Sequence, residues 1–244
     1  MLLELSARNI LRSAAAVVFA MTFFASSTAF AQGYVQTNLV SDIPGLAPTT
    51  DPLTVNPWGI TRSGTSPWWI ADNGTGVSTI YNGAGVASQN PPGVQFVVHI
   101  PNAPSGTGTA SPTGVVFNGT ADFGGKRFIF AAEDGTISGW PGAGGDLFNA
   151  QLEVDHSSTA IYKGLTLASF NGANYLYAAN FHGGVVEAFD TNFAPFSFSA
   201  TAFKDPQIPS GYAPFNVQAV GNTIVVTFAK QDKDQEEGIG PCQR

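Results

Sequence analysis

A short motif that returns about every fifty residues is the feature that most constrains the fold of this chain. Each occurrence is followed by a second apolar run, and in the first three units a glycine-containing turn leads into a third run. The motif occurs at Pro57–Ile60, Pro112–Val115, Tyr162–Leu165 and Pro214–Val217. The second runs are Trp68–Ala71, Phe128–Ala132, Tyr175–Ala179 and Ile224–Phe228, and the third runs are Val77–Tyr81, Ile137–Trp140 and Val185–Phe189. This period, with three or four short strands in each unit, predicts an all-β fold built from β-propeller blades.

Turn residues separate these runs, and no stretch beyond the N-terminal segment keeps a helical period over three turns. Asp72–Gly76 and Glu133–Thr136 predict tight hairpins because Asn-Gly and Asp-Gly accept a positive φ at low cost, and Phe181–Gly184 has the same place in the third unit. The loops between units have room for outer strands such as Val94–Ile100. We expect a further strand over Tyr34–Val40, since an N-terminal strand often completes the last blade of a closed propeller.

The repeat stops before a ring is complete. The fourth unit gives way to the polar run Lys230–Glu237 after its second strand. We therefore expect residues 32–231 to form a partial propeller of about 3.5 to 4 blades, followed by a disordered or frameshifted tail over residues 232–244.

Two explanations of this ending stay open. A frameshift or premature stop after Gln231 would explain both the lost repeat and the odd Cys242. A chain that ends naturally at Arg244 would instead need a dimeric or otherwise completed ring.

The N-terminal segment has the pattern of a secretory signal peptide. Arg8 and Arg12 precede the apolar stretch Ser13–Phe24, and Ala29–Ala31 supplies the small residues of a cleavage site. Residues 1–31 are therefore predicted to be removed on export, which places the mature protein in the periplasm or outside the cell. Because the apolar stretch is too short to span a bilayer comfortably, we expect no transmembrane segment after cleavage.

Charge and cysteine content narrow the classes of partner. The chain has 10 basic and 17 acidic side chains and a net charge of −7, and its basic residues are not clustered. Nucleic acid and anionic membrane surfaces are therefore poor partners. The single cysteine makes no internal disulfide, so the fold is not a disulfide scaffold.

Several longer segments carry a resemblance to a known group of proteins. They are Tyr34–Asp42, Asn56–Ile60, Asp72–Thr79, Glu133–Trp140, Tyr177–Phe181 and Gly211–Asn216. On these segments the chain resembles an uncharacterised family of secreted bacterial proteins related to NHL-repeat and gluconolactonase-like six-bladed propellers, some of which carry a PEP-CTERM sorting signal. The resemblance implies a propeller, export and no established activity. Similar proteins continue for roughly two further blades.

The propeller prediction places a set of polar side chains on one face. The loop before each innermost strand and the loop between the second and third strands open on the same side of a blade. Asn56, Ser111 and Lys163 precede inner strands. The candidate ligand-binding residues taken from the two loops are Asn56, Asp72, Asn73, Glu133, Asp134, Asn180 and His182.

Two interpretations of this set stay open. Carboxylate and amide oxygens are the ligands of Ca²⁺, and gluconolactonase-like propellers use such a set around one metal, where the ion can polarise a lactone carbonyl. Asp and Asn before Gly are also what hairpin turns require without any function. No zinc spacing, nucleophile elbow or Walker-type loop occurs in the chain.

The sequence thus leaves three functional readings. The first is a non-enzymatic exported propeller that binds a protein, glycan or small-molecule ligand. The second is a Ca²⁺-dependent lactonase-like hydrolase with its site at the central channel. The third is a truncated copy without independent function. Propellers host both binding and catalysis, so the fold does not decide among these readings.

Overall fold

The computed structural model describes residues 33–238, and these residues form an all-β fold. The described part contains no α-helix, only the short 3₁₀ turns η1 (Phe123–Gly125) and η2 (Gly142–Gly144). The chain divides into two units between Thr37 and Asn38, and all of the sheets belong to the second. The predicted signal peptide, residues 239–244 and Cys242 lie outside the described residues.

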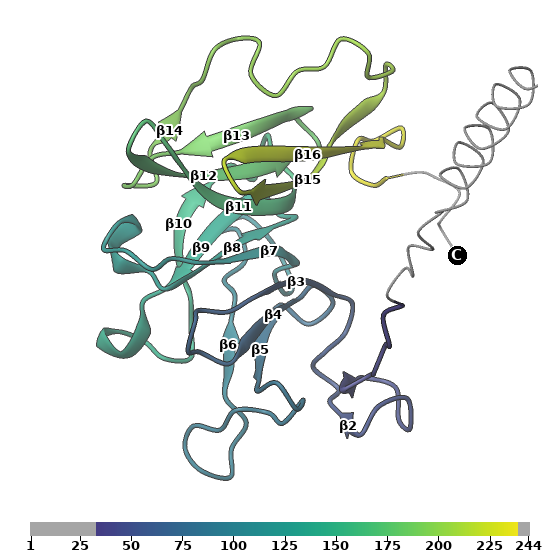
Figure 1. Cartoon of the computed structure of the whole chain (residues 1–244), viewed down its shortest axis with the longest axis vertical. Helices are drawn as coiled ribbons and strands as arrows, with labels where there is room; N and C mark the ends of the chain where they lie inside the picture. The colour runs from purple at the N-terminus through teal and green to yellow at the C-terminus, as the bar shows by residue number, and fades with distance from the viewer. Residues whose placement is uncertain (1–32, 239–244) are drawn as a thin grey trace, which may run out of the picture. The chain divides into compact units, whose positions relative to one another are not determined.

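Three successive four-stranded antiparallel sheets and one two-stranded antiparallel sheet contain the repeats, and within each sheet every strand pairs with the next along the chain (Figure 1). A further two-stranded sheet precedes them. Sheet 1 contains β3 (Pro57–Thr61), β4 (Trp68–Asp72), β5 (Val77–Tyr81) and β6 (Val97–His99). Sheet 2 contains β7 (Pro112–Phe117), β8 (Phe128–Ala132), β9 (Thr136–Trp140) and β10 (Gln151–Asp155). Sheet 3 contains β11 (Tyr162–Phe170), β12 (Ala173–Asn180), β13 (Val185–Phe189) and β14 (Pro195–Phe196). Sheet 4 contains β15 (Tyr212–Val220) and β16 (Thr223–Lys230).

These sheets confirm the all-β prediction and the strands predicted within each repeat. They also confirm an outer strand within Val94–Ile100, as β6. The strand predicted over Tyr34–Val40 is wrong over most of its length, because only Val40–Ser41 forms a strand, β1. β1 pairs in parallel with β2 (Thr49–Thr50). Tyr34, Val35 and Leu39 are all exposed, so the apolar residues of this segment bury little surface that would hold it in a ladder.

The first strands of the four sheets, β3, β7, β11 and β15, lie next to one another in chain order. The repeated glycine makes this close approach possible. A Cβ on Gly59 would lie 2.7 Å from the Thr113 carbonyl oxygen, and one on Gly114 would lie 2.5 Å from the Leu165 nitrogen. Glycine is therefore required at these positions by the backbone of the neighbouring sheet.

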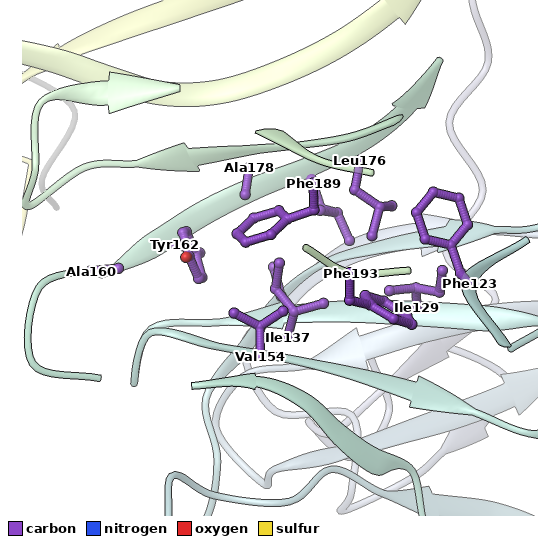
Figure 2. Packing of buried hydrophobic residues seen from close by; sticks show 12 residues of the cluster. Phe123, Ile129, Ile137, Val154, Ala160, Tyr162, Leu176, Ala178, Phe189 and Phe193 are labelled. Carbon is purple, nitrogen blue, oxygen red and sulfur yellow. The ribbon is translucent and has the colours of Figure 1, made fainter. Parts of the chain in front are cut away.

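The sheets bury their faces against each other in separate layers. Alternate residues of β8 face opposite sides, as the pleat of a strand requires. Phe128 and Phe130 join the cluster shared with Trp69 of sheet 1, where the rings of Trp69 and Phe128 stack with centroids 4.0 Å apart. Ile129 belongs to the cluster between sheets 2 and 3 (Figure 2). The other labelled members of that cluster are Phe123, Ile137, Val154, Ala160, Tyr162, Leu176, Ala178, Phe189 and Phe193.

Candidate functional site

Each inner strand contains an irregularity at the same place in its repeat. In sheet 2, Pro112 pairs with Ala132 and Gly114 pairs with Ala131, which leaves Thr113 as an unpaired bulge residue. The register shifts in the same way at Lys163 in β11 and at Phe215 in β15, and between Pro57 and Ile60 in β3. A bulge takes one side chain out of the alternation of its strand and re-aims it.

The bulge of sheet 3 places a lysine in a buried position. The side chain of Lys163 is 0% exposed, and its ammonium group contacts the Glu133 carboxylate. A second carboxylate oxygen, Glu237 Oε2, lies 3.3 Å from Lys163 Nζ, and the Glu237 side chain is 62% exposed. The buried charge is therefore paired once inside the fold and once at its surface.

Aromatic rings form the rest of the lysine's surroundings. Lys163 Nζ lies 5.5 Å from the centroid of the Trp58 ring and 6.0 Å from that of Phe181. Phe215 connects these two rings, with centroid distances of 5.9 Å to Trp58 and 5.6 Å to Phe181. An ammonium group within about 6 Å of a ring face is attracted by the ring's quadrupole, so these rings add a favourable contact to the Lys163 ammonium group. We call Lys163, Glu133, Glu237, Trp58, Phe181 and Phe215 the Lys163 site.

Three of the residues predicted from the sequence converge on the Lys163 site. Asn56 Nδ2 donates a hydrogen bond to Asn73 Oδ1 at 3.0 Å. Asn73 Nδ2 then donates to Glu133 Oε2 at 2.9 Å, and the other oxygen of Glu133 accepts from Lys163. Asn56 has a positive φ of 49°, a conformation that Asn adopts more readily than most residues. A chain of polar contacts therefore joins sheets 1, 2 and 3.

Two other predicted residues, Asp72 and Asp134, hold their own hairpins. Asp72 Oδ2 accepts from the Thr79 backbone N–H and hydroxyl at 3.0 and 2.7 Å. Asp134 Oδ1 accepts from the Thr136 hydroxyl at 2.6 Å, and Asp134 Oδ2 accepts from the Ala103 N–H at 2.7 Å. Asp72 therefore joins the two strands of its hairpin, whereas Asp134 bonds within its own turn and to the segment before β7.

Asp72 nevertheless has an unusual electrostatic environment. It is fully buried, and its Oδ1 atom has no hydrogen-bond partner among the described residues. Burial raises the pKa of Asp72 to about 7, against the opposing effect of the two Thr79 hydrogen bonds. This carboxyl group therefore titrates near neutral pH.

The last two predicted residues lie at the turn between β12 and β13. Asn180 Oδ1 accepts from the backbone N–H groups of Ile161 and Gly183, and Asn180 Nδ2 donates to Glu187 Oε1 at 2.6 Å. The buried Asn180 thus stabilises the backbone of sheet 3. His182 is half-buried, and within residues 33–238 its Nδ1 atom is buried without a hydrogen-bond partner.

Sequence reasoning placed Lys163 before an inner strand but left it out of the candidate ligand set. The available signal was its second position in the repeated motif, where the other units have Trp58, Thr113 and Phe215. Nothing in the pattern marked that position as a bulge. Glu237, assigned to the tail, also approaches the site: residues 231 and 238 form a bridge that brings the intervening turn back onto the fold.

The residues that converge do not fit a Ca²⁺ site. Ca²⁺ needs six to eight oxygen ligands, as a rule, whereas the centre of this set is the Lys163 ammonium group, which repels a cation. Within residues 33–238, no group of three or more His, Cys, Asp or Glu side chains is arranged to hold a metal ion. The arrangement instead pairs one buried cation with the carboxylates of Glu133 and Glu237.

Comparison with known proteins gives relatives without an assigned activity. No model of a known protein family matches the chain. The chain is similar to two uncharacterised proteins of Acanthamoeba polyphaga mimivirus. One is 30% identical over 210 residues, covering 80% of this chain and 48% of the relative. The other is 27% identical over 208 residues, covering 80% of this chain and 52% of the relative.

The chain therefore spans about half the length of the curated relatives it matches. In the part of the chain that the structure describes, none of the helical turns has the length and apolar character needed to cross a bilayer.

Proposed function

We propose that sheets 1 to 4 are consecutive blades of a β-propeller of the six-bladed NHL and gluconolactonase-like type. Two observations support this arrangement. Each sheet is a meander in chain order, and the first strand of each sheet lies beside the first strand of the next. The repeated glycines Gly59 and Gly114 lie at these contacts. In a propeller the first strands surround the central channel, so the Lys163 site would lie at one end of that channel.

We further propose that the protein is an exported, non-enzymatic binding module, and that the Lys163 site takes a ligand with an acidic group. The observation that carries this proposal is the fully buried Lys163 side chain, which meets aromatic rings and contacts a second carboxylate, Glu237, whose own side chain is 62% exposed. An ion pair to an exposed carboxylate is weak because water and salt screen it. A ligand carboxylate can therefore replace Glu237, while Trp58 and Phe215 offer ring faces to its apolar part.

A direct titration tests this function. Benzoate is a suitable probe because it joins a ring to a carboxylate, and benzamide is its neutral counterpart. We expect benzoate to bind in a salt-dependent way that changes tryptophan fluorescence, and benzamide to bind about tenfold more weakly, since hydrogen bonds to charged groups are worth about 1.5–3 kcal/mol.

Three variants sharpen the test. Lys163→Met should abolish the preference for benzoate, whereas Lys230→Met, which removes an exposed lysine of β16, should retain it. Glu237→Gln alters no buried group and should raise the benzoate affinity by removing the competing carboxylate. Equal binding of both probes by the unmodified protein, or no effect of Glu237→Gln, would contradict the proposal.

No specific observation at this site favours the hypothesis of a Ca²⁺-dependent lactonase. Both carboxylate oxygens of Glu133 already accept hydrogen bonds, one from Lys163 and one from Asn73. Calorimetric titration with Ca²⁺ checks it directly. Uptake of one ion per chain that is lost in Glu133→Gln would restore the hydrolase reading.

A further inference from the structure

A second concave site lies along the edge of β13, in sheet 3. It is a cavity of about 360 Å³ whose lining comes from β13, β14, the segment that follows β14, and His156. None of the residues of the Lys163 site lines it. Its volume lies at the lower end of the range found for small-molecule sites, about 300–1,000 Å³.

Phenylalanine rings form the apolar wall of this cavity. Phe196, Phe198 and Phe203 all line it, with ring centroids 4.9 Å apart for Phe196 and Phe198 and 5.9 Å apart for Phe198 and Phe203. Phe203 has a positive φ of 58°, which is strained for a bulky residue. Packing of its ring against Tyr177, at a centroid distance of 5.8 Å, holds it in place. The rings of the wall therefore meet one another edge to face, at interplanar angles of 73° for Phe196 and Phe198 and 87° for Phe198 and Phe203.

A hydrogen-bonded histidine supplies the polar end of the cavity. His156 Nδ1 lies 2.9 Å from Glu187 Oε2, and both residues line the cavity. The Tyr162 hydroxyl donates to the same Glu187 oxygen at 2.7 Å, and Asn180 donates to the other oxygen at 2.6 Å. The carboxylate of Glu187 accepts a hydrogen bond from His156 Nδ1–H, and the Tyr162 hydroxyl oxygen lies 3.0 Å from the same nitrogen. In the tautomer that carries its proton on Nδ1, Nε2 is an acceptor. Within residues 33–238, Nε2 has no hydrogen-bond partner.

The open edge of β13 adds a second polar group. β14 pairs only with Ala188 and Phe189. The N–H of Asp190 points toward the edge of β13 on which β14 lies, since it donates to the Ala194 carbonyl at 2.8 Å. Because alternate residues of a strand direct their N–H and C=O groups to the same edge, those of Val186 also point to this side, where no strand of the described chain covers them. Val186 lines the cavity.

We propose that this cavity binds a flat aromatic compound that bears a hydroxyl group. The ring of such a ligand stacks on the phenylalanine wall, in the offset or edge-to-face arrangements that aromatic pairs prefer. Its hydroxyl donates to His156 Nε2, the acceptor that Glu187 fixes. The backbone of Val186 offers a further hydrogen bond to a second polar substituent. This site is independent of the acidic ligand proposed for the Lys163 site.

Ligand-observed NMR titration of the full chain tests the proposal with 2-naphthol and its methyl ether. The two probes share the ring system, but only 2-naphthol can donate a hydrogen bond. We expect 2-naphthol to bind about fivefold more tightly, the effect of one hydrogen bond of about 1 kcal/mol. His156→Phe keeps an aromatic ring but removes Nε2 and should bring the two affinities together. His99→Phe, at an exposed histidine of β6, should leave the preference unchanged.

A second variant keeps the test decisive if His156→Phe does not fold, which a circular-dichroism melt will show. Phe198→Ala removes part of the stacking wall and should weaken both probes by a similar factor while the preference for 2-naphthol remains. Equal affinities in the unmodified protein, a preference that survives in His156→Phe, or no loss of binding in Phe198→Ala would each overturn the proposal.

Discussion

Lys163 has the position in its repeat that Trp58, Thr113 and Phe215 have in the other units. The bulge explains why such different side chains are accepted there, because each leaves its strand at a point where the ladder is already interrupted. Burying an ammonium group costs several kcal/mol unless a counter-charge meets it. Glu133 from sheet 2 provides that charge. The same pair therefore stabilises the contact between two sheets and keeps a cation available at the site.

Asp72 gives the clearest prediction at the scale of one residue, because its carboxyl group is buried and its pKa is raised from 3.8 to about 7. A carboxyl group with a raised folded-state pKa stabilises the fold fully below its unfolded pKa and loses that contribution as the pH rises through the folded value. The free energy of unfolding should therefore fall by about 2–3 kcal/mol between pH 5 and pH 8 from this group.

Asp72→Asn should remove this pH dependence. The Asn carbonyl oxygen can accept both Thr79 hydrogen bonds, and the amide group carries no charge at either pH. Urea unfolding of both proteins at pH 5 and pH 8 measures the effect. The same loss of stability with pH in the variant would show that Asp72 is not the titrating group.

At the scale of elements, the strands could be predicted because each buries apolar residues between turns rich in Gly, Asn and Asp. The run Phe128–Ala132 is buried at every position and became β8. The predicted strand over Tyr34–Val40 also contains apolar residues, but Tyr34, Val35 and Leu39 remain exposed. The bulges could not be predicted, since one extra residue in a strand leaves no mark in a hydrophobic pattern. For that reason the sequence indicated the polar turn residues but not the centre of the Lys163 site.

The packing between sheets requires a glycine in the repeated motif, and this requirement can be tested. A Cβ on Gly114 would lie 2.5 Å from the Leu165 nitrogen and 2.6 Å from Leu165 Cβ, whereas one on Gly83 would meet nothing within 4 Å. Gly114→Ala should therefore destabilise the protein by about 2–3 kcal/mol, because backbone atoms of β11 must move. Gly83→Ala should be neutral or slightly stabilising. Thermal melts of the two variants compare them, and equal stabilities would show that β7 and β11 do not approach this closely.

At the scale of the whole molecule, burial is unequal among the sheets. Sheet 2 packs against a neighbour on each face, with Phe130 in one cluster and Ile129 in the other. Among the described residues, the buried cluster of sheet 4 lies against sheet 3, where Val217 meets Tyr177. None of the residues of β16 is fully buried. In arrays of repeated units, stability comes from each unit and its contacts with its neighbours, so sheet 4 receives less than sheet 2.

Native-state hydrogen exchange should reveal this gradient. Amides of β8 that donate within sheet 2 should exchange only through global unfolding, because both faces of the strand are buried. Amides of β16 that donate to β15 should exchange at least about tenfold faster, through an opening that separates sheet 4 from sheet 3. Gly114→Ala, which acts between sheets 2 and 3, should speed exchange in β8 relative to the unmodified protein. Equal protection of β8 and β16 would mean that the four sheets open as one cooperative unit, and that the contact between sheets 3 and 4 is as strong as the contacts around sheet 2.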